Sequence, residues 1–171
     1  FSAIENLSVP VIAAVNGIAL AGGLELVMVC DLAIAADNVK LSDQHANRGL
    51  VPGGGASQRL PRLIGIRKAK ELLYTGDRIT AVEAERLGLI NKAVPADTLE
   101  AATNEMVAKL VSKSPMAMKA VKKLVNRGME GSLDTGLELE MLAMTAHGTT
   151  EDFAEGIKSF LEGRQPQFPG R

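Results

Sequence analysis

Two adjacent glycines and a nearby glutamate form the strongest chemical signal in the sequence. Gly22 and Gly23 follow a short apolar run and precede Leu24, where a helix is predicted to begin. The first N–H groups of a helix have no acceptor within the helix and carry partial positive charge, and glycine lets a ligand oxygen approach them closely. Gly22 or Gly23 is therefore a candidate donor to an oxyanion.

Glu25 lies in the first turn of this predicted helix, between Leu24 and Leu26. A carboxylate among apolar side chains is costly to bury without a partner, which makes Glu25 a candidate acid/base. The plainer interpretation is that its charge only complements the positive helix N-terminus. Spacing alone slightly favours the plainer interpretation, because a Gly-Gly pair is neither a dinucleotide nor a phosphate-loop fingerprint.

His45 is a second candidate acid/base, in the segment Asp43-Gln-His45 ahead of a glycine-rich run. A neutral imidazole can accept or donate a proton near pH 7. The alternative, which is the commoner case for an isolated histidine, is an exposed loop residue without a role. His147 lies near a predicted helix end and Cys30 within a predicted apolar helix, so a capping role and a core role are expected for them.

The elements that must position these candidates are of α/β type in the first half of the chain. Strands are expected at 11–15, 32–36, 40–42 and 90–94, and a helix at 24–30. The capping-box spacing Thr80-Ala-Val-Glu83 predicts a further helix that ends near Gly88.

The second half reads as helices at roughly 97–113, 115–128, 132–147 and 150–162, with Pro115 in the first turn of its helix. Methionine-bearing helix faces are more often core or subunit contacts than ligand sites, so we interpret these helices as an interaction surface. We expect two domains, a core at 1–95 and a helical region at 96–171.

Composition excludes several classes of protein. The 171 residues have 19 Lys+Arg and 20 Asp+Glu, and 3 % aromatic residues, so neither a basic surface nor a stacking platform for nucleic acid is expected. The single cysteine excludes a disulfide framework and a cysteine zinc cluster, and no metal site is expected. Because no apolar run reaches membrane-span length and residues 1–7 do not form a signal peptide, we expect no membrane partner and a cytoplasmic location. An organelle is the alternative if a targeting segment was removed.

Taken together, these motifs resemble the crotonase, or enoyl-CoA hydratase/isomerase, family. The matching segments cover nearly the whole chain in the family's order and include Pro10–Gly17, Ala21–Leu26, Cys30–Ala35, Gly49–Gly55 and Glu151–Glu162. The resemblance implies an α/β fold, a crotonase-like ββα spiral truncated at its N-terminus and followed by a helical C-terminal trimerisation region. It also implies a homotrimer or a dimer of trimers.

The resemblance further implies an acyl-CoA substrate, with coenzyme A as part of the thioester and no tightly bound cofactor. The expected reaction is addition of water to the double bond of an α,β-unsaturated acyl-CoA. Gly22 matches one of two backbone oxyanion donors, the other lying upstream of this sequence, and Glu25 matches the first of two water-holding glutamates. His45 stands where the second glutamate would fall. The substrate-binding residues expected on this basis are Ala21, Gly22, Gly23, Pro52 and Gly53.

The histidine at position 45 keeps alternatives open. An enoyl-CoA isomerase or an acyl-CoA hydrolase of the same family would use a Glu25–His45 pair differently, and a non-catalytic fragment or assembly module would need neither group. Loss of one of two oxyanion donors removes roughly 3–4 kcal/mol of transition-state stabilisation. We therefore expect the 171-residue chain alone to be a weak catalyst.

Overall fold

The computed structural model describes residues 1–171, which form two compact units. The first consists of Phe1–Leu7 and Val11–Met106, and the second of Ser8–Pro10 and Val107–Arg171. Compactness alone does not define domains, so the division into 1–95 and 96–171 stays a prediction.

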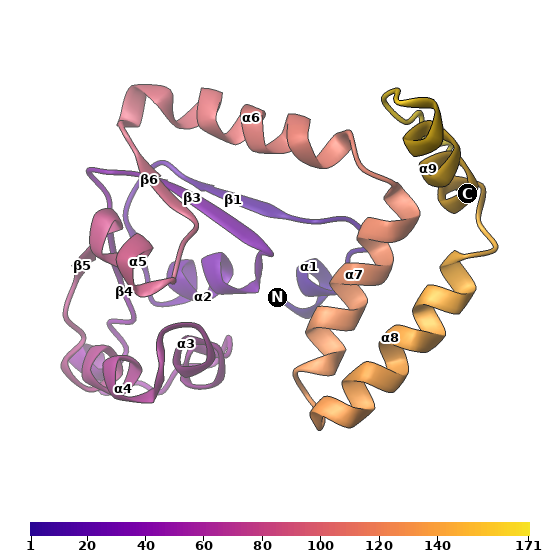
Figure 1. Ribbon diagram of the computed structural model, residues 1–171. Helices are drawn as coiled ribbons and strands as arrows, with labels where there is room; N and C mark the ends of the chain where they lie inside the picture. Colours follow the sequence, from indigo (N-terminus) through magenta and orange to yellow (C-terminus); the bar gives the residue numbers. More distant parts are fainter. The chain divides into compact units, whose positions relative to one another are not determined.

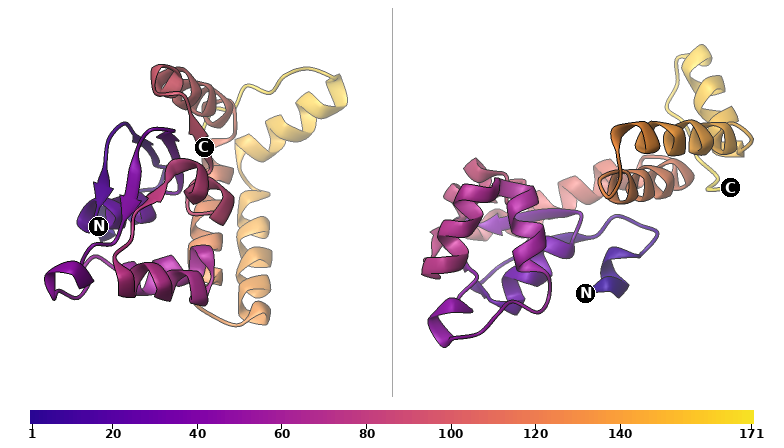
Figure 2. Two further views of the ribbon diagram at one scale, coloured as in Figure 1. Left: turned by 90° about the vertical axis from the view of Figure 1, so that its left-hand side faces the viewer. Right: turned by 90° about the horizontal axis from the view of Figure 1, so that it is seen from below.

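The first unit contains two small three-stranded sheets (Figures 1 and 2). In one sheet the strands are parallel, in the order β1 (Ile12–Val15), β3 (Leu32–Ala36) and β6 (Lys92–Val94). In the other, β4 (Lys40–Ser42) lies between its parallel neighbour β2 (Ala19–Leu20) and its antiparallel neighbour β5 (Ile79–Thr80). The strands expected at 32–36 and 40–42 are confirmed, the one at 11–15 begins a residue later and the one at 90–94 begins two residues later.

Helices follow the strands in a repeating order. The first unit contains α1 (Ser2–Glu5), α2 (Gly22–Val29), α3 (Ala56–Ile64), α4 (Ile66–Thr75), α5 (Ala81–Leu87), the single 3₁₀ turns η1 (Ala46–Arg48) and η2 (Ala96–Thr98), and the start of α6 (Leu99–Val111). The order β1-β2-α2 is repeated as β3-β4-α3, with η1 between β4 and α3, and each repeat contributes one strand to each sheet. This repetition is the ββα spiral that the sequence predicts.

The boundaries of α2 correct two expectations from the sequence. The helix begins at Gly22, not Leu24, so both glycines lie inside its first turn. It ends at Val29, and Cys30 is the extended residue that follows the helix, half-buried, with its Sγ 3.4 Å from the carbonyl oxygen of Leu26. The predicted place of Cys30 within the helix is therefore wrong.

Aliphatic side chains and alanines form the core of the first unit. The side chains of Leu24, Ile34, Leu41 and Leu60 are at most 2 % exposed. Ala35 and Ala36 of β3 are equally buried, and their small size lets the helices approach the parallel strands. Thr80 caps α5 by accepting a hydrogen bond from the N–H of Glu83 at 3.1 Å, as its spacing predicts.

Beyond α6, three capped helices make up the second unit. They are α7 (Pro115–Gly128), α8 (Leu133–His147) and α9 (Glu151–Glu162), and all three expected helices are confirmed, with Pro115 at the first position. A serine or threonine precedes each helix and accepts a hydrogen bond from an N–H of its first turn. α7 and α8 lie side by side as an antiparallel pair (Figures 1 and 2), and Gly128 and Gly136 lie next to each other between them.

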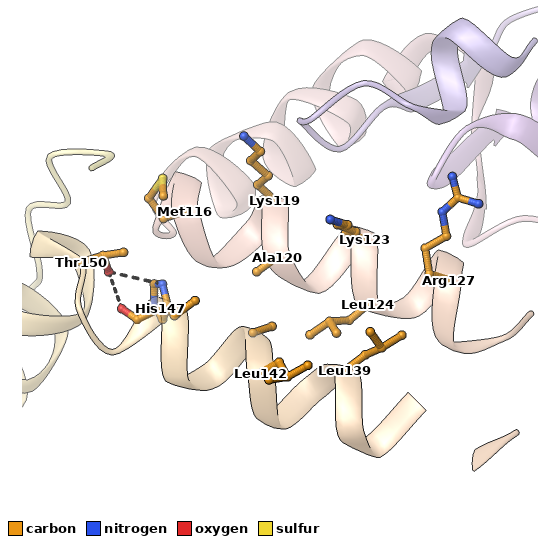
Figure 3. A pocket seen from close by; sticks show the side chains of 12 residues that line it. Met116, Lys119, Ala120, Lys123, Leu124, Arg127, Leu139, Leu142, His147 and Thr150 are labelled. Carbon is orange, nitrogen blue, oxygen red and sulfur yellow. Dashed lines mark hydrogen bonds between the residues drawn. The ribbon is translucent and has the colours of Figure 1, made fainter. Parts of the chain in front are cut away.

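A groove of about 670 Å³ runs between α7 and α8 (Figure 3). Its floor is mainly apolar, from residues such as Leu124 of α7 and Leu139 of α8. Lys119, Lys123 and Arg127, spaced four residues apart, place three cations along the α7 side. Within this chain the groove leaves apolar side chains of both helices uncovered.

Asp152 connects the start of α9, the start of α7 and the C-terminal residues. Its side chain is 1 % exposed, and its carboxylate accepts hydrogen bonds from Ser114 Oγ, the N–H of Met116 (3.3 Å) and the N–H of Gly170 (2.7 Å). Burial alone would raise the pKa of this carboxyl, but the hydrogen bonds, with Ser114 the largest contributor, outweigh burial and hold the pKa below its usual value.

We expect Asp152→Ala to lower the free energy of unfolding by about 3 kcal/mol at neutral pH, because several buried donors lose a charged acceptor. Since the native pKa lies below the unfolded one, this stabilisation is present above the usual aspartate range and is lost as the pH falls through the native pKa. Urea denaturation at pH 7 and at about pH 3 measures both effects.

The adjacent Glu151 provides a matched control, because its carboxylate is 60 % exposed and pairs with Arg171 at 3.0 Å on the surface. Glu151→Ala should change the free energy of unfolding by less than about 1 kcal/mol. Equal losses in the two variants, or a loss for Asp152→Ala that does not shrink in acid, would contradict the assignment.

Candidate active site

The parallel pairing of β2 and β4 brings the two chemical segments together. Leu20, the last residue of β2, is paired with Ser42, the last residue of β4. The N–H of Ala21 donates to the carbonyl oxygen of Ser42 at 2.9 Å. The carboxyl ends of parallel strands lie at one edge of a sheet, so α2 and the loop that contains His45 leave the sheet side by side.

The turn into α2 leaves backbone donors at its start. Ala21 adopts φ 48° and ψ −116°, a strained conformation that turns the chain sharply from β2 into the helix. Gly22 and Gly23 are the exposed first residues of α2, whose N-terminus has no side-chain cap. A Cβ on Gly22 would meet nothing within 4 Å. An exposed and uncapped helix start suits the predicted role of these glycines, whose donation to a ligand oxygen stays a prediction.

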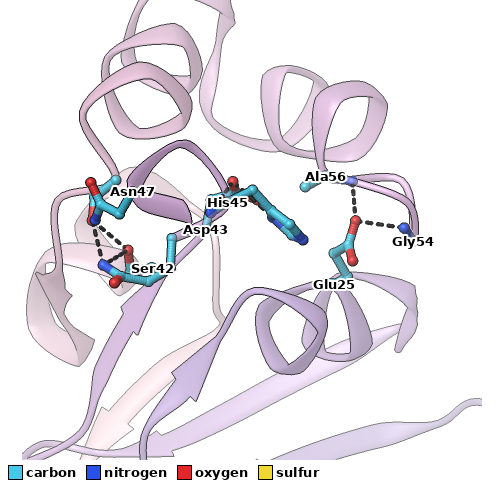
Figure 4. A network of polar contacts seen from close by, with 9 residues as sticks. Glu25, Ser42, Asp43, His45, Asn47, Gly54 and Ala56 are labelled. Carbon is cyan, nitrogen blue, oxygen red and sulfur yellow. Dashed lines mark hydrogen bonds and ion pairs between the residues drawn. The ribbon is translucent and has the colours of Figure 1, made fainter. Parts of the chain in front are cut away.

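Glu25 is buried, with 3 % of its surface exposed, and its two carboxylate oxygens differ in their surroundings. Oε1 accepts hydrogen bonds from the N–H of Gly54 at 2.7 Å and from the N–H of Ala56 at 3.0 Å (Figure 4). Ala56 is the first residue of α3, so the positive N-terminus of a second helix also stabilises this charge. Oε2 accepts no hydrogen bond from the chain, which leaves it for a water or a substrate.

The plainer interpretation of Glu25 therefore does not describe its role fully. A glutamate that only complemented its own helix would need no partner from another element, whereas Oε1 is held by residues 29 and 31 positions further along the chain. The arrangement fixes the carboxylate in place while one oxygen stays unengaged. Such a group can take up and release a proton at a defined position.

His45 lies against the buried carboxylate of Asp43. The side chain of His45 is 12 % exposed and that of Asp43 1 %, and Nδ1 is 3.0 Å from Oδ1 of Asp43, although the contact lacks the angles of a hydrogen bond. In Figure 4 the imidazole extends toward the side on which Glu25 lies. The exposed position of the alternative is wrong, because only 12 % of the side chain of His45 is exposed.

One carbonyl group anchors the loop around His45. The oxygen of Gly76 accepts hydrogen bonds from Ser42 Oγ (2.9 Å), Gln44 Nε2 (2.5 Å) and Asn47 Nδ2 (3.3 Å). Gln44 has a positive φ of 60°, which few non-glycine residues adopt without such support. These contacts hold the loop on both sides of His45.

Other predicted residues lie outside this set of contacts. Pro52 is half-buried and Gly53 exposed, and neither donates a hydrogen bond to Glu25; the next glycine, Gly54, does. His147 ends α8 in the other unit, where its carbonyl oxygen and Nδ1 face Thr150 Oγ1 at 2.7 and 3.3 Å. It has the helix-end position expected for it.

Sequence reasoning missed three contributors to the site, namely Asp43, Gly54 and Ala56. The run Gly53-Gly54-Gly55 was the available signal for two of them, since consecutive glycines allow a backbone to approach another group closely. For Asp43 the signal was its place two residues before the candidate histidine. No group of three His, Cys, Asp or Glu side chains is arranged to hold a metal ion, and no helix is long and apolar enough to cross a membrane.

Comparison with known proteins agrees with this geometry. Residues 1–171 match the family model described as enoyl-CoA hydratase/isomerase. The chain belongs to this family.

Two named hydratases are similar to this chain over part of their own length. Crotonyl-CoA hydratase of Syntrophomonas wolfei subsp. wolfei is 44 % identical over 168 residues, which cover 98 % of this chain and 65 % of the relative. Short-chain-enoyl-CoA hydratase of Clostridium acetobutylicum is 42 % identical over 165 residues, which cover 96 % and 63 %. The chain thus spans slightly less than two thirds of the length of these hydratases.

Solved structures of the family confirm the α/β fold class. The crystal structure of an enoyl-CoA hydratase from Bacillus anthracis superimposes with a TM-score of 0.97 at 43 % identity, covering 99 % of this chain and 66 % of that one. An enoyl-CoA hydratase structure from Geobacillus kaustophilus HTA426 gives a TM-score of 0.96 at 37 % identity, with the same coverage. The ββα spiral and the helical C-terminal part predicted from the sequence are therefore the fold of this family.

We expect Gly54→Ala to displace the Glu25 carboxylate. A Cβ at this position would lie 2.6 Å from Glu25 Oε2 and 2.2 Å from the ring of Phe1, so the loop or the carboxylate must move. The free energy of unfolding should fall by about 1–3 kcal/mol, as for other overpacked sites. Urea denaturation and a crystal structure of the variant measure the two effects.

Gly53→Ala is the matched control, because a Cβ on Gly53 would meet nothing within 4 Å. It should leave both the stability and the Glu25 position unchanged. If the two alanine variants behave alike, close approach at Gly54 does not determine the site.

Proposed function

We propose that the protein containing this chain is an enoyl-CoA hydratase. The observation that supports this most directly is the buried Glu25 carboxylate, with Oε1 held by the N–H groups of Gly54 and Ala56 and Oε2 unengaged. It lies in the same helix as the open N–H of Gly22. The Syntrophomonas and Clostridium relatives are also named as hydratases.

In the proposed reaction, the thioester oxygen of the substrate accepts a hydrogen bond from the N–H of Gly22. This donor stabilises the negative charge that develops on the oxygen when water attacks the β-carbon. Glu25 Oε2 takes a proton from the attacking water and delivers a proton to the α-carbon, so that one water is added in full. His45 orients the water, and coenzyme A enters as part of the substrate, without a tightly bound cofactor.

The contacts proposed for the thioester come from both glycine segments. Ala21, Gly22 and Gly23 form the turn into α2, and Pro52 and Gly53 precede the residues that hold Glu25. Four of the five have small side chains or none, so the acyl group can approach the backbone.

Glu25→Gln should lower kcat/KM for an enoyl-CoA at least about 100-fold, with KM changed only a few-fold, because the amide cannot take up the proton but still fits the site. The measurement is the loss of enoyl thioester absorbance, in the native protein that contains this chain. Glu71→Gln, at an exposed helix position, should have the parental rate. A Glu25→Gln variant as active as the parent would overturn this mechanism.

Isomerisation or thioester hydrolysis is the second candidate reaction. It is favoured by the imidazole at position 45, which lies beside the buried carboxylate of Asp43. Product analysis of the parent distinguishes the three reactions. Hydration yields a 3-hydroxyacyl-CoA, isomerisation a shifted double bond, and hydrolysis free coenzyme A. If neither turnover nor saturable binding of a CoA thioester is found by calorimetry, a non-catalytic assembly module is the better description.

We also propose that the protein is a homotrimer or a dimer of trimers. The support is the apolar surface of α8 and α9, where several large side chains are more than half exposed in the single chain, among them Leu133, Met141, Phe160 and Leu161. Exposed apolar patches of this kind mark protein interfaces more often than free surface.

Native mass spectrometry should find three or six copies of the native protein. Phe160→Asp should reduce this number, whereas Lys158→Asp, an exposed position on the same helix, should not. A monomeric parent would contradict the proposal.

For location we propose the cytoplasm, with an organelle as the alternative. One relative, from Mus musculus, is named as a mitochondrial enoyl-CoA hydratase domain-containing protein. No nucleic-acid or membrane partner is proposed.

A further inference from the structure

Asp43 is a buried carboxylate that its own loop does not satisfy. Its side chain is 1 % exposed. Oδ1 accepts only a long hydrogen bond, 3.3 Å, from the N–H of His45, and Oδ2 is buried without a hydrogen-bond partner. A buried carboxylate is unfavourable unless a donor or a positive charge compensates it, so this group calls for a partner in its immediate surroundings.

The imidazole of His45 also lacks a hydrogen-bond partner, and its nitrogen could supply the donor that Asp43 needs. Its Nδ1 is also buried without a hydrogen-bond partner, and it lies 3.0 Å from Asp43 Oδ1. Only the angle is missing, and a small rotation of either side chain would point an N–H at the carboxylate. Since an ionised carboxylate can only accept, Nδ1 has to carry the proton for the pair to be satisfied.

Other polar side chains of the loop are engaged elsewhere. Ser42 Oγ, Gln44 Nε2 and Asn47 Nδ2 all donate to the carbonyl oxygen of Gly76. The same contacts hold the loop in place on both sides of His45. Asp43 is therefore the group in contact with Nδ1 that can select its protonation.

We propose that Asp43 is a positioning residue that keeps His45 in the Nδ1–H tautomer, with the unprotonated Nε2 available to the active site. Nε2 then accepts a hydrogen bond from one O–H of the water, while Glu25 takes the proton of the other. In the opposite tautomer Nε2–H would donate to the water oxygen, which withdraws electron density from the nucleophile and weakens its attack on the β-carbon. The role in hydration rests on the proposed function; the tautomer does not.

The tautomer can be read directly from the ¹⁵N shifts of the imidazole rings in the native protein, by long-range ¹H–¹⁵N correlation with His45 neutral. The parent should show a protonated Nδ1 and an unprotonated Nε2 at His45. Asp43→Asn should change this pattern toward Nε2–H or a mixture. His147, the only other histidine, has its own partner in Thr150 and should keep its pattern in both proteins.

The parent spectrum decides the matter even if Asp43→Asn does not fold. An Nε2–H tautomer at His45 in the parent overturns the proposal, and so does an unchanged Nδ1–H tautomer in a folded Asp43→Asn variant. An Nδ1–H tautomer in a parent that does not hydrate enoyl-CoA supports the positioning role and contradicts only the proposed function.

Kinetics test whether this positioning matters for the reaction. Asp43→Asn should lower kcat by about 10–100-fold with KM changed only a few-fold, as for other residues that orient an active-site imidazole. Asp37→Asn, at an exposed position after β3, should have the parental kcat. A folded Asp43→Asn variant with parental kcat would show that His45 needs no orientation by Asp43.

Discussion

The burial of the Glu25 carboxylate is the constraint on which the site depends. A charge in an apolar interior requires donors, and here they are the backbone N–H groups of Gly54 and Ala56. The loop before α3 must therefore pass close to α2, which only a residue without a side chain permits at position 54. The need to supply donors to this buried carboxylate therefore explains the start of α3, the glycine run before it and the fixed position of Glu25.

The pairing of β2 with β4 brings the histidine loop next to the helix that carries Glu25. Two short parallel strands end at the same edge, so the candidate oxyanion donors after β2 and the histidine after β4 start from neighbouring points. The two non-glycine residues with positive φ are Ala21, directly after β2, and Gln44, two residues after β4. Backbone strain is thus concentrated where the chain turns into the site, and the hydrogen bonds to Gly76 offset part of it.

The carboxylates of Glu25 and Asp43 differ in how many hydrogen-bond donors the chain provides for them. Glu25 Oε1 has two backbone donors and keeps its position, while Oε2 remains open for chemistry. Asp43 has one long backbone donor and a histidine within reach. A charge that is held by fixed backbone groups suits a proton carrier, whereas a charge that still lacks a donor suits the orientation of a neighbouring imidazole.

The sequence by itself determined the local features: the helices at roughly 115–128, 132–147 and 150–162, the strands at 32–36 and 40–42, and Gly22 and Glu25 as candidates. Periodicity and capping act over a few residues, so they can be read from the chain alone. The two-residue strands β2 and β5 have no such period and were missed. Only the tertiary structure decided that His45 lies half-buried against Asp43 and that Glu25 is held from 29 residues away. Both depend on long-range backbone contacts, which no local pattern records.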